Sequence, residues 1–203
     1  MKIILIGAAG TLGKAVDHAL KARHEIVRVG RSHGDFQVDI TDPESIEQLF
    51  TKVGDFDAVV STAGDVHFAP LQTFSQDQFQ VGLRSKLMGQ VNLVMLGMKH
   101  IRDGGSFTLT TGQINDDPIS VGASGAMVNG GLEGFVRSSA VELPRGLRIN
   151  IVSPTVTEES WSAFGPFFPG QKPIPASEAA LGYVKSVESR QTGKVFRIGW
   201  SRD

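Results

Sequence analysis

The chain of 203 residues contains no cysteine and only one tyrosine, Tyr183. The lack of cysteine excludes disulfides, thiolate catalysis and cysteine-ligated metals, and it fits a reducing cytoplasm, where we expect the protein to act. Long apolar runs are also missing, since none approaches the ~20 residues that a membrane-spanning helix needs. The apolar run that begins at Ile3 is too short and too abrupt for a signal peptide. We therefore expect no membrane partner.

Neither sign of charge dominates the sequence. Twenty Lys and Arg face 21 Asp and Glu, so the net charge is −1, and the basic residues are scattered. A nucleic-acid surface or a membrane-binding patch needs clustered basic residues, so a small-molecule partner is the expectation, with no nucleic acid and no metal. The length suggests one domain over residues 1–203, long enough to bury a full core.

Strand and helix signals alternate along the whole chain. Continuous apolar, β-branched runs predict strands over 2–7, 25–30, 57–64, 105–112, 147–154 and 194–200. Apolar residues at helical spacing predict helices over 11–23, 43–53, 75–100, 124–142 and 176–188. The alternation predicts an α/β fold, a doubly wound parallel sheet of the Rossmann type with helices on both faces. Only 155–175, rich in Pro, Gly and aromatics, lacks a regular pattern.

The first strand runs into the glycine-rich sequence GAAGTLG, which opens the first helix. A turn this tight needs glycine, and a side chain at Gly10 would block a pyrophosphate, while Gly13 lets helix and strand pack closely. The helix N-terminus offers free N–H groups and a positive dipole end to phosphates. The placement predicts a dinucleotide site, with a plain tight turn as the alternative.

The second strand lacks the terminal acid that would bind a ribose 2′-hydroxyl. Arg31 stands there instead and can pair with a 2′-phosphate, to which Ser32 or His33 can add a hydrogen bond. This favours NADP over NAD, unless Arg31 is simply a solvated loop cation. Asp39, a little further on, can contact the adenine amino group or merely cap a turn.

Seven segments in this order resemble the short-chain dehydrogenase/reductase family over essentially the whole chain. They are GAAGTLG (7–13), VDI (38–40), STAG (61–64), GGSFTLTTG (104–112), ASGAMVNGGLEGFVRSSAVEL (123–143), LRINIVSP (147–154) and TGKVFRI (192–198). The resemblance implies a nicotinamide dinucleotide along the carboxyl edge of the sheet. The implied cofactor-binding residues are Gly7, Ala9, Gly10, Thr11, Leu12, Arg31, Ser32, Asp39, Ile40, Thr62, Ala63, Gly64 and Pro154.

The chain departs from the family at all four catalytic positions. Members use a serine, a tyrosine, a lysine four residues later and an asparagine on the preceding helix. The resemblance places Thr111 at the serine position, with Thr110 as an alternative, and Lys86 at the asparagine position. Val121 and Gly125 replace the tyrosine and the lysine. Threonine can still donate a hydrogen bond, but valine cannot transfer a proton, so the family's relay cannot operate unchanged.

The change of Lys86 and Gly125 together suggests that a lysine has moved between helices. The stem of Lys86 could fill the space beside Gly125 and bring the ammonium back to the site, or Lys86 could point to solvent. Tyr183 is expected in the core, far from the nicotinamide, and His67 is a reserve acid or an exposed loop residue.

Two functions therefore stay open. The first is an atypical NADP-dependent oxidoreductase of a small carbonyl or alcohol, in which Thr111 polarises the carbonyl and Lys86, or a water that it holds, supplies the proton. The second is a catalytically silent dinucleotide binder that acts as a sensor or an assembly unit. The segment 155–175 is expected to form a substrate lid or an interface through its aromatic residues Trp161, Phe164, Phe167 and Phe168.

The resemblance also implies a homodimer or homotetramer built partly on the two long central helices. Small residues on the helix predicted over 124–142 would allow close helix approach. They are Ala126, Gly130, Gly131, Gly134, Ser138 and Ala140.

Overall fold

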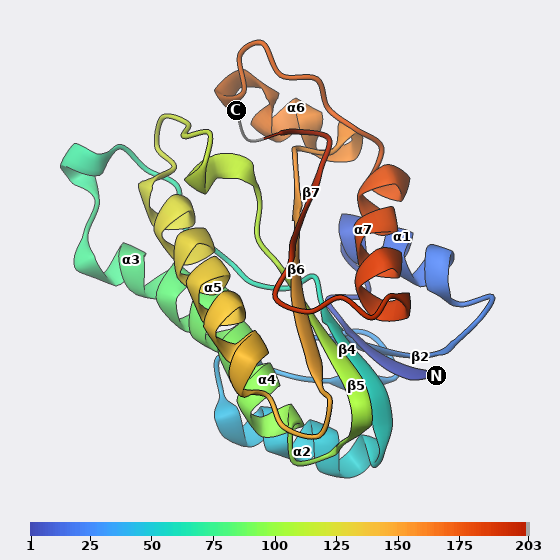
Figure 1. The fold of residues 1–203 in the computed structure, drawn as a ribbon. Coiled ribbons are helices and arrows are strands. Elements are labelled where there is room, and N and C mark those ends of the chain that lie inside the picture. Colours follow the sequence, from blue (N-terminus) through green and yellow to red (C-terminus); the bar gives the residue numbers. More distant parts are fainter. Residues whose placement is uncertain (202–203) are drawn as a thin grey trace.

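Seven parallel strands form a single sheet in the computed structural model, which describes residues 1–201 (Figure 1). The strands are β1 (Lys2–Ile6), β2 (Glu25–Gly30), β3 (Phe36–Gln37), β4 (Phe56–Ser61), β5 (Ile101–Thr110), β6 (Arg148–Pro154) and β7 (Val195–Ile198). Their order is β3-β2-β1-β4-β5-β6-β7. Successive strands are therefore added on one side of β1 up to β3 and on its other side from β4 onward. Ligands of open α/β sheets bind outside the carboxyl ends of the strands at this reversal. The predicted fold class is confirmed.

Helices cover both faces of the sheet (Figure 1). The longer ones are α1 (Thr11–Leu20), α2 (Pro43–Val53), α3 (Gln76–Gly82), α4 (Gln90–Gly97), α5 (Ala123–Glu142) and α7 (Ala176–Glu188). The shorter ones are η1 (Leu71–Thr73), η2 (Leu83–Gly89), η3 (Gln113–Asn115), η4 (Glu158–Ser160), α6 (Trp161–Phe164) and η5 (Gly165–Phe167). α1 and α7 lie together on one face, whereas α2, α4 and α5 cover the other. No helix among residues 1–201 is long and apolar enough to cross a membrane.

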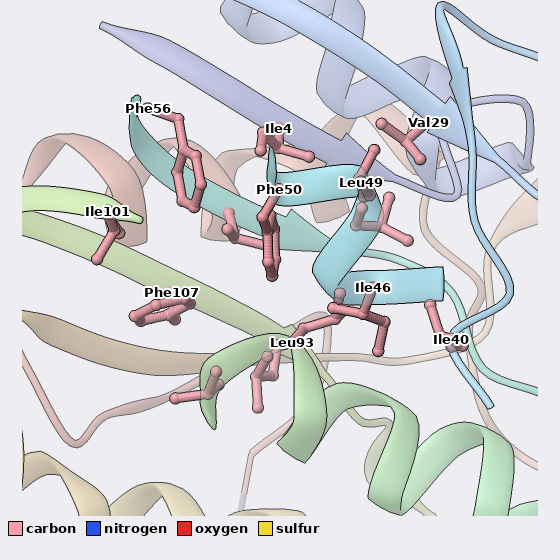
Figure 2. Packing of buried hydrophobic residues seen from close by; sticks show 14 of the residues in the cluster. Ile4, Val29, Ile40, Ile46, Leu49, Phe50, Phe56, Leu93, Ile101 and Phe107 are labelled. Carbon is pink, nitrogen blue, oxygen red and sulfur yellow. The ribbon is translucent and has the colours of Figure 1, made fainter. Parts of the chain in front are cut away.

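The core follows from this layering. On the face of α2 and α4, Phe50 packs against Phe56 with ring centroids 5.2 Å apart, and Phe107 and Leu93 close the same cluster (Figure 2). On the opposite face, Tyr183 of α7 is fully buried among apolar residues of the sheet and α1. Burial raises the pKa of the Tyr183 phenol well above its usual range. Tyr183 is therefore a core residue, as predicted.

Three expectations about the elements needed correction. The strand predicted to start at 105 begins at Ile101, because Arg145 donates to the Ile101 carbonyl (3.0 Å) and pairs with Asp103 (2.7 Å), which holds a turn-like sequence extended. β3 was not predicted, since a two-residue edge strand has no periodicity to detect. Residues 155–175, predicted as irregular, contain three short helices.

The helix predicted over 75–100 is divided into three parts. α3 starts with a capping box in which Ser75 and Gln78 bond each other's backbone N–H groups. η2 then continues as a π-helix, and α4 resumes the α-helical geometry at Gln90. A π-helical turn inside an α-helix is rare and often marks a functional site. Lys86 lies within it.

The side chain of Gln90 fastens this π-helical turn to the sheet. It is fully buried, donates to the carbonyls of Thr110 (2.9 Å) and Lys86 (3.1 Å), and accepts the Thr110 N–H (2.8 Å). These bonds satisfy the last residue of β5 and one carbonyl of the irregular helix. Gln90 thereby sets how closely Lys86 approaches the carboxyl end of β5.

We expect Gln90→Leu to lower the free energy of unfolding by roughly 3 kcal/mol or more. The substitution removes this partner from the buried N–H and carbonyl of Thr110 and from the part-buried carbonyl of Lys86. Each such loss from a buried group costs about 1–3 kcal/mol. Urea denaturation followed by circular dichroism measures the effect. Gln48→Leu, on the exposed side of α2, is the matched control and should change stability by less than about 0.5 kcal/mol. Equal losses of stability in the two variants would contradict the role assigned to the Gln90 hydrogen bonds.

Candidate active site

Two neighbouring cavities open at the carboxyl ends of the strands. The first, which we call the β1–β2 cavity, is lined by the predicted residues Gly7, Ala9, Gly10, Arg31, Ile40 and 62–64. The second, the β5–β6 cavity, is lined by Thr11, Leu12, Lys86, Thr111 and Pro154. The structure thus brings most of the predicted cofactor and catalytic residues to one edge, divided between two compartments.

The glycines of the first loop leave room for a pyrophosphate. At Gly13 an added Cβ would lie 2.1 Å from the Gly7 carbonyl oxygen, so the close packing of helix and strand requires glycine. At Gly10 the nearest atom would be 3.4 Å away, an ordinary contact, so the protein itself has no need for glycine there. Since Gly10 lines the cavity and begins a helix without a side-chain cap, its missing side chain keeps N–H groups accessible to a ligand.

Two predicted residues do not line either cavity. Asp39 accepts hydrogen bonds from the Thr41 N–H (2.9 Å) and hydroxyl (2.7 Å), so it caps a turn, and these bonds hold its pKa below the usual range. The Ser32 hydroxyl pairs with His33 Nδ1 at 2.8 Å. Ser32 and Asp39 therefore lie next to lining residues of the β1–β2 cavity but do not line it themselves.

The structure separates the two candidate threonines. Thr110 Oγ1 donates to the Ser61 carbonyl and lies 2.8 Å from the Tyr183 hydroxyl, so its bonding capacity is used inside the core. Thr111 Oγ1 is buried with no hydrogen-bond partner among residues 1–201, and Thr111 lines the β5–β6 cavity. Of the two, Thr111 has the hydroxyl that is available to a ligand.

Two further polar atoms of this cavity are unsatisfied. Thr155 Oγ1 and Gln113 Oε1 are buried and have no partner within the described chain, and both residues line the β5–β6 cavity. Buried polar groups are normally hydrogen-bonded. With the Thr111 hydroxyl, three such unpaired oxygens belong to residues that line this one cavity. Neither Thr155 nor Gln113 was predicted, because a loop threonine or glutamine carries no signal of its own.

Lys86 reaches the same cavity. Its side chain is half-buried and makes no hydrogen bond or ion pair within residues 1–201, and burial lowers its pKa to about 8. It carries the only ionisable side chain in the cavity lining that the structure describes. Of the two predicted placements, the structure therefore favours the one in which Lys86 faces the site.

The chain is similar to known oxidoreductases over most of its length. A family model described as enoyl-(acyl carrier protein) reductase matches residues 8–188. The chain belongs to the short-chain dehydrogenase/reductase family. Among solved structures, protein lin1944 from Listeria innocua is 49% identical, with a TM-score of 0.96 over 97% of this chain and 98% of that one. A small-chain dehydrogenase solved in complex with NADPH shares the fold at 23% identity and a TM-score of 0.86, covering 97% and 95%.

Curated members of the family are more distant. Glucose and ribitol dehydrogenase homolog 2 of Arabidopsis thaliana is 25% identical over 150 residues, 68% of this chain and 52% of that protein. The versicolorin reductase stcU of Emericella nidulans is 28% identical over 144 residues, 67% and 54%. The chain therefore spans about half the length of these relatives.

Val121, predicted at the family's tyrosine position, does not line the β5–β6 cavity. Val121 lines a third cavity, with Ala69, Leu71 and Pro118, and has a positive φ of 61°, unusual for a β-branched residue. Ile114 and Ile119 line both this cavity and the β5–β6 cavity, so they form the wall between them.

The space beside Gly125 is not filled by Lys86. An added Cβ at Gly125 would lie 2.6 Å from Ile114 Cδ1 and 3.5 Å from the Phe68 ring. The nearest atoms at the position predicted for the missing lysine are therefore those of Ile114 and Phe68, and the predicted exchange with Lys86 stays a hypothesis. Ile114 comes from η3 and Phe68 from the β4–α3 loop, and Lys86 enters the cavity from its own helix.

His67 contributes to neither the β1–β2 nor the β5–β6 cavity. Its ring packs edge-on against Phe74 with centroids 5.7 Å apart, so it belongs to a small aromatic cluster with Phe79. A metal role is equally unsupported, since residues 1–201 contain no group of three His, Asp or Glu placed to hold an ion.

We expect the Lys86 ammonium to titrate near pH 8, to which the structure lowers its pKa. Heteronuclear NMR of the lysine side chains, with the Lys86 signal assigned by its loss in Lys86→Met, measures the value. The unfolded chain keeps this proton to about 10.5, so it binds more protons than the folded chain between pH 8 and 10.5. Stability relative to Lys86→Met should therefore rise with pH across that window. A titration near 10.5 would place Lys86 in solvent.

Proposed function

We propose that the protein is an NADP(H)-dependent oxidoreductase that interconverts a carbonyl and an alcohol by an atypical route. The observation that carries the proposal is the meeting of the unpaired Thr111 hydroxyl and the Lys86 side chain in one cavity. Thr11 and Leu12, at the start of α1, line the same cavity, so a dinucleotide held by the phosphate loop would end there.

The cofactor supplies the hydride when it is bound, and the chain's own residues handle the substrate oxygen. The Thr111 hydroxyl donates to that oxygen and polarises the carbonyl. The Lys86 ammonium then stabilises the negative charge that develops on the oxygen and delivers a proton to it. A pKa of about 8 leaves most of Lys86 protonated at neutral pH, yet makes it a better donor than an ordinary lysine.

The walls of the β5–β6 cavity favour a substrate with an apolar body. Phe68, Ile114 and Ile119 line one part, and Phe164 and Phe168 come from the segment 155–175. The Phe68 and Phe164 rings, which both line the cavity, meet edge to face with centroids 6.1 Å apart. Trp161 packs over Gly165 instead, and neither Trp161 nor Phe167 lines this cavity, so Phe164 and Phe168 are the aromatics of this segment that we assign to a substrate lid.

We expect the protein to reduce apolar aldehydes or ketones with NADPH. The decrease in NADPH absorbance measures the rate. Lys86→Met should lower kcat by about 10²-fold or more, within the range that general acid catalysis contributes. Thr111→Val, which keeps the shape, should lower it by at least about tenfold. Lys99→Met, on an exposed lysine, is the charge-matched control and should keep full activity.

Tight NADPH binding with no turnover on any substrate of the panel would overturn the oxidoreductase proposal. The catalytically silent binder would then be the better description. Fluorescence titration with NADPH, run on the same preparations, separates a failure of binding from a failure of chemistry.

The proposed assembly is a homodimer or homotetramer built on α4 and α5. Exposed apolar residues gather on these helices, among them Met95, Met127 and Val141. Gly130 and Gly134 of α5 are exposed, and a Cβ added to either meets no atom within 4 Å. Glycine inside a helix costs roughly 0.5–1 kcal/mol relative to alanine, so a bare glycine surface needs a reason outside the single chain, and a second copy supplies one.

We expect light scattering at micromolar concentration to give at least a dimer. Gly134→Arg should shift the protein towards monomer without loss of circular dichroism, because the long side chain cannot be accommodated between closely packed helices. Ser162→Arg, in the exposed α6, adds the same side chain and should leave the mass unchanged. A monomeric parent protein would overturn the proposed assembly.

A further inference from the structure

The mouth of the β1–β2 cavity is bridged by an ion pair. Arg31 Nη2 lies 2.8 Å from Asp65 Oδ2, and both residues line the cavity. Arg31 follows β2, and Asp65 follows β4 after the sequence STAG, so the pair joins two segments on either side of β1. The guanidinium on which NADP selection depends is therefore already bound to a carboxylate.

Asp65 is held in this place by its backbone. Gly64, before it, has a φ of +132°, and an added Cβ there would lie 2.8 Å from Lys86 Cα, so the chain is pressed against η2. The N–H of Asp65 donates to Ser85 Oγ at 2.9 Å, and Ser85 is buried. The carboxylate of Asp65 therefore projects from a fixed point towards Arg31.

A second carboxylate stands near the same guanidinium. Asp39 is held mainly by Thr41, but the positive charge of Arg31 also contributes to its low pKa. The Arg31 guanidinium thus lies near two carboxylates, those of Asp65 and Asp39. A 2′-phosphate at this end of the cavity would add about two more negative charges. The Arg31–Asp65 pair is exposed on both sides, with side-chain exposures of 67% and 60%, so it is weak enough to be exchanged.

We propose that Asp65 determines cofactor selectivity by competing with the 2′-phosphate for Arg31. The inference rests on the NADP(H) binding of the proposed function and adds a residue that opposes it. With Asp65 in place, Arg31 raises the affinity for NADPH over that for NADH by less than a guanidinium without an ion-pair partner would. NADH has no phosphate at this position, so its affinity does not depend on the competition.

The test is the affinity of NADPH and of NADH, measured by fluorescence titration without substrate. Asp65→Asn keeps the shape and the backbone bond to Ser85. It should tighten NADPH binding by about two- to fivefold, because the 2′-phosphate no longer has to displace an exposed ion pair from Arg31, and it should change NADH binding by less than twofold. Asp55→Asn is the matched control: it removes the same charge from the exposed residue before β4, at the opposite edge of the sheet, and should leave both affinities unchanged.

Arg31→Ala distinguishes competition from simple repulsion. In that background Asp65→Asn should tighten NADPH by less than twofold, because the guanidinium for which Asp65 competes is gone. An equal gain with and without Arg31 would overturn the inference, as would an unchanged ratio of NADPH to NADH affinity in Asp65→Asn. Both of these results leave the proposed function standing. Failure of the parent protein to bind either dinucleotide would overturn the proposed function, and this inference with it.

Discussion

The candidate site depends on the close contact between the π-helical turn η2 and the carboxyl ends of β4 and β5. Gly64 permits this approach because any side chain there would strike Lys86 Cα, and Gln90 secures it through three hydrogen bonds to the backbone of Thr110 and Lys86. The same contact places Ser85 against Asp65 and so orients a carboxylate in the neighbouring cavity. One packing arrangement therefore positions a cation in the β5–β6 cavity and an anion in the β1–β2 cavity.

Val121 and Gly125, which the sequence predicts at the family's tyrosine and lysine positions, lie against a packed wall. Ile114 fills the space at Gly125, and with Ile119 it separates the β5–β6 cavity from the one that Val121 lines. Val121 adopts a left-handed backbone conformation that is costly for a β-branched residue and that persists only where the surroundings impose it. The loop between β5 and α5 thus leaves Val121 outside the β5–β6 cavity.

The two cavities differ in a way that suits a dinucleotide and a separate substrate. The β1–β2 cavity is bordered by backbone, small side chains and the Arg31–Asp65 pair, which suits phosphates and ribose. The β5–β6 cavity combines aromatic walls with unpaired oxygens and one amine. Because burial penalises an isolated charge, the amine of Lys86 has a lowered pKa only where the walls are apolar. The apolar walls and the lowered pKa of Lys86 are therefore two aspects of one environment.

The amino-acid sequence by itself determined the layers of the fold, because buried parallel strands and amphipathic helices have different periodicities, and it determined that Gly13 must be glycine. It also indicated Arg31 and the departures at Val121 and Gly125, since these depend only on residue type and order. Only the tertiary structure decided which side chains lie next to these residues. Ile114 is 11 residues from Gly125 and Asp65 is 34 residues from Arg31 in the chain, yet each pair is in contact. The π-helical turn likewise leaves no mark in a pattern of apolar residues. Contacts of this kind come from how the elements pack, and local periodicity carries no information about them.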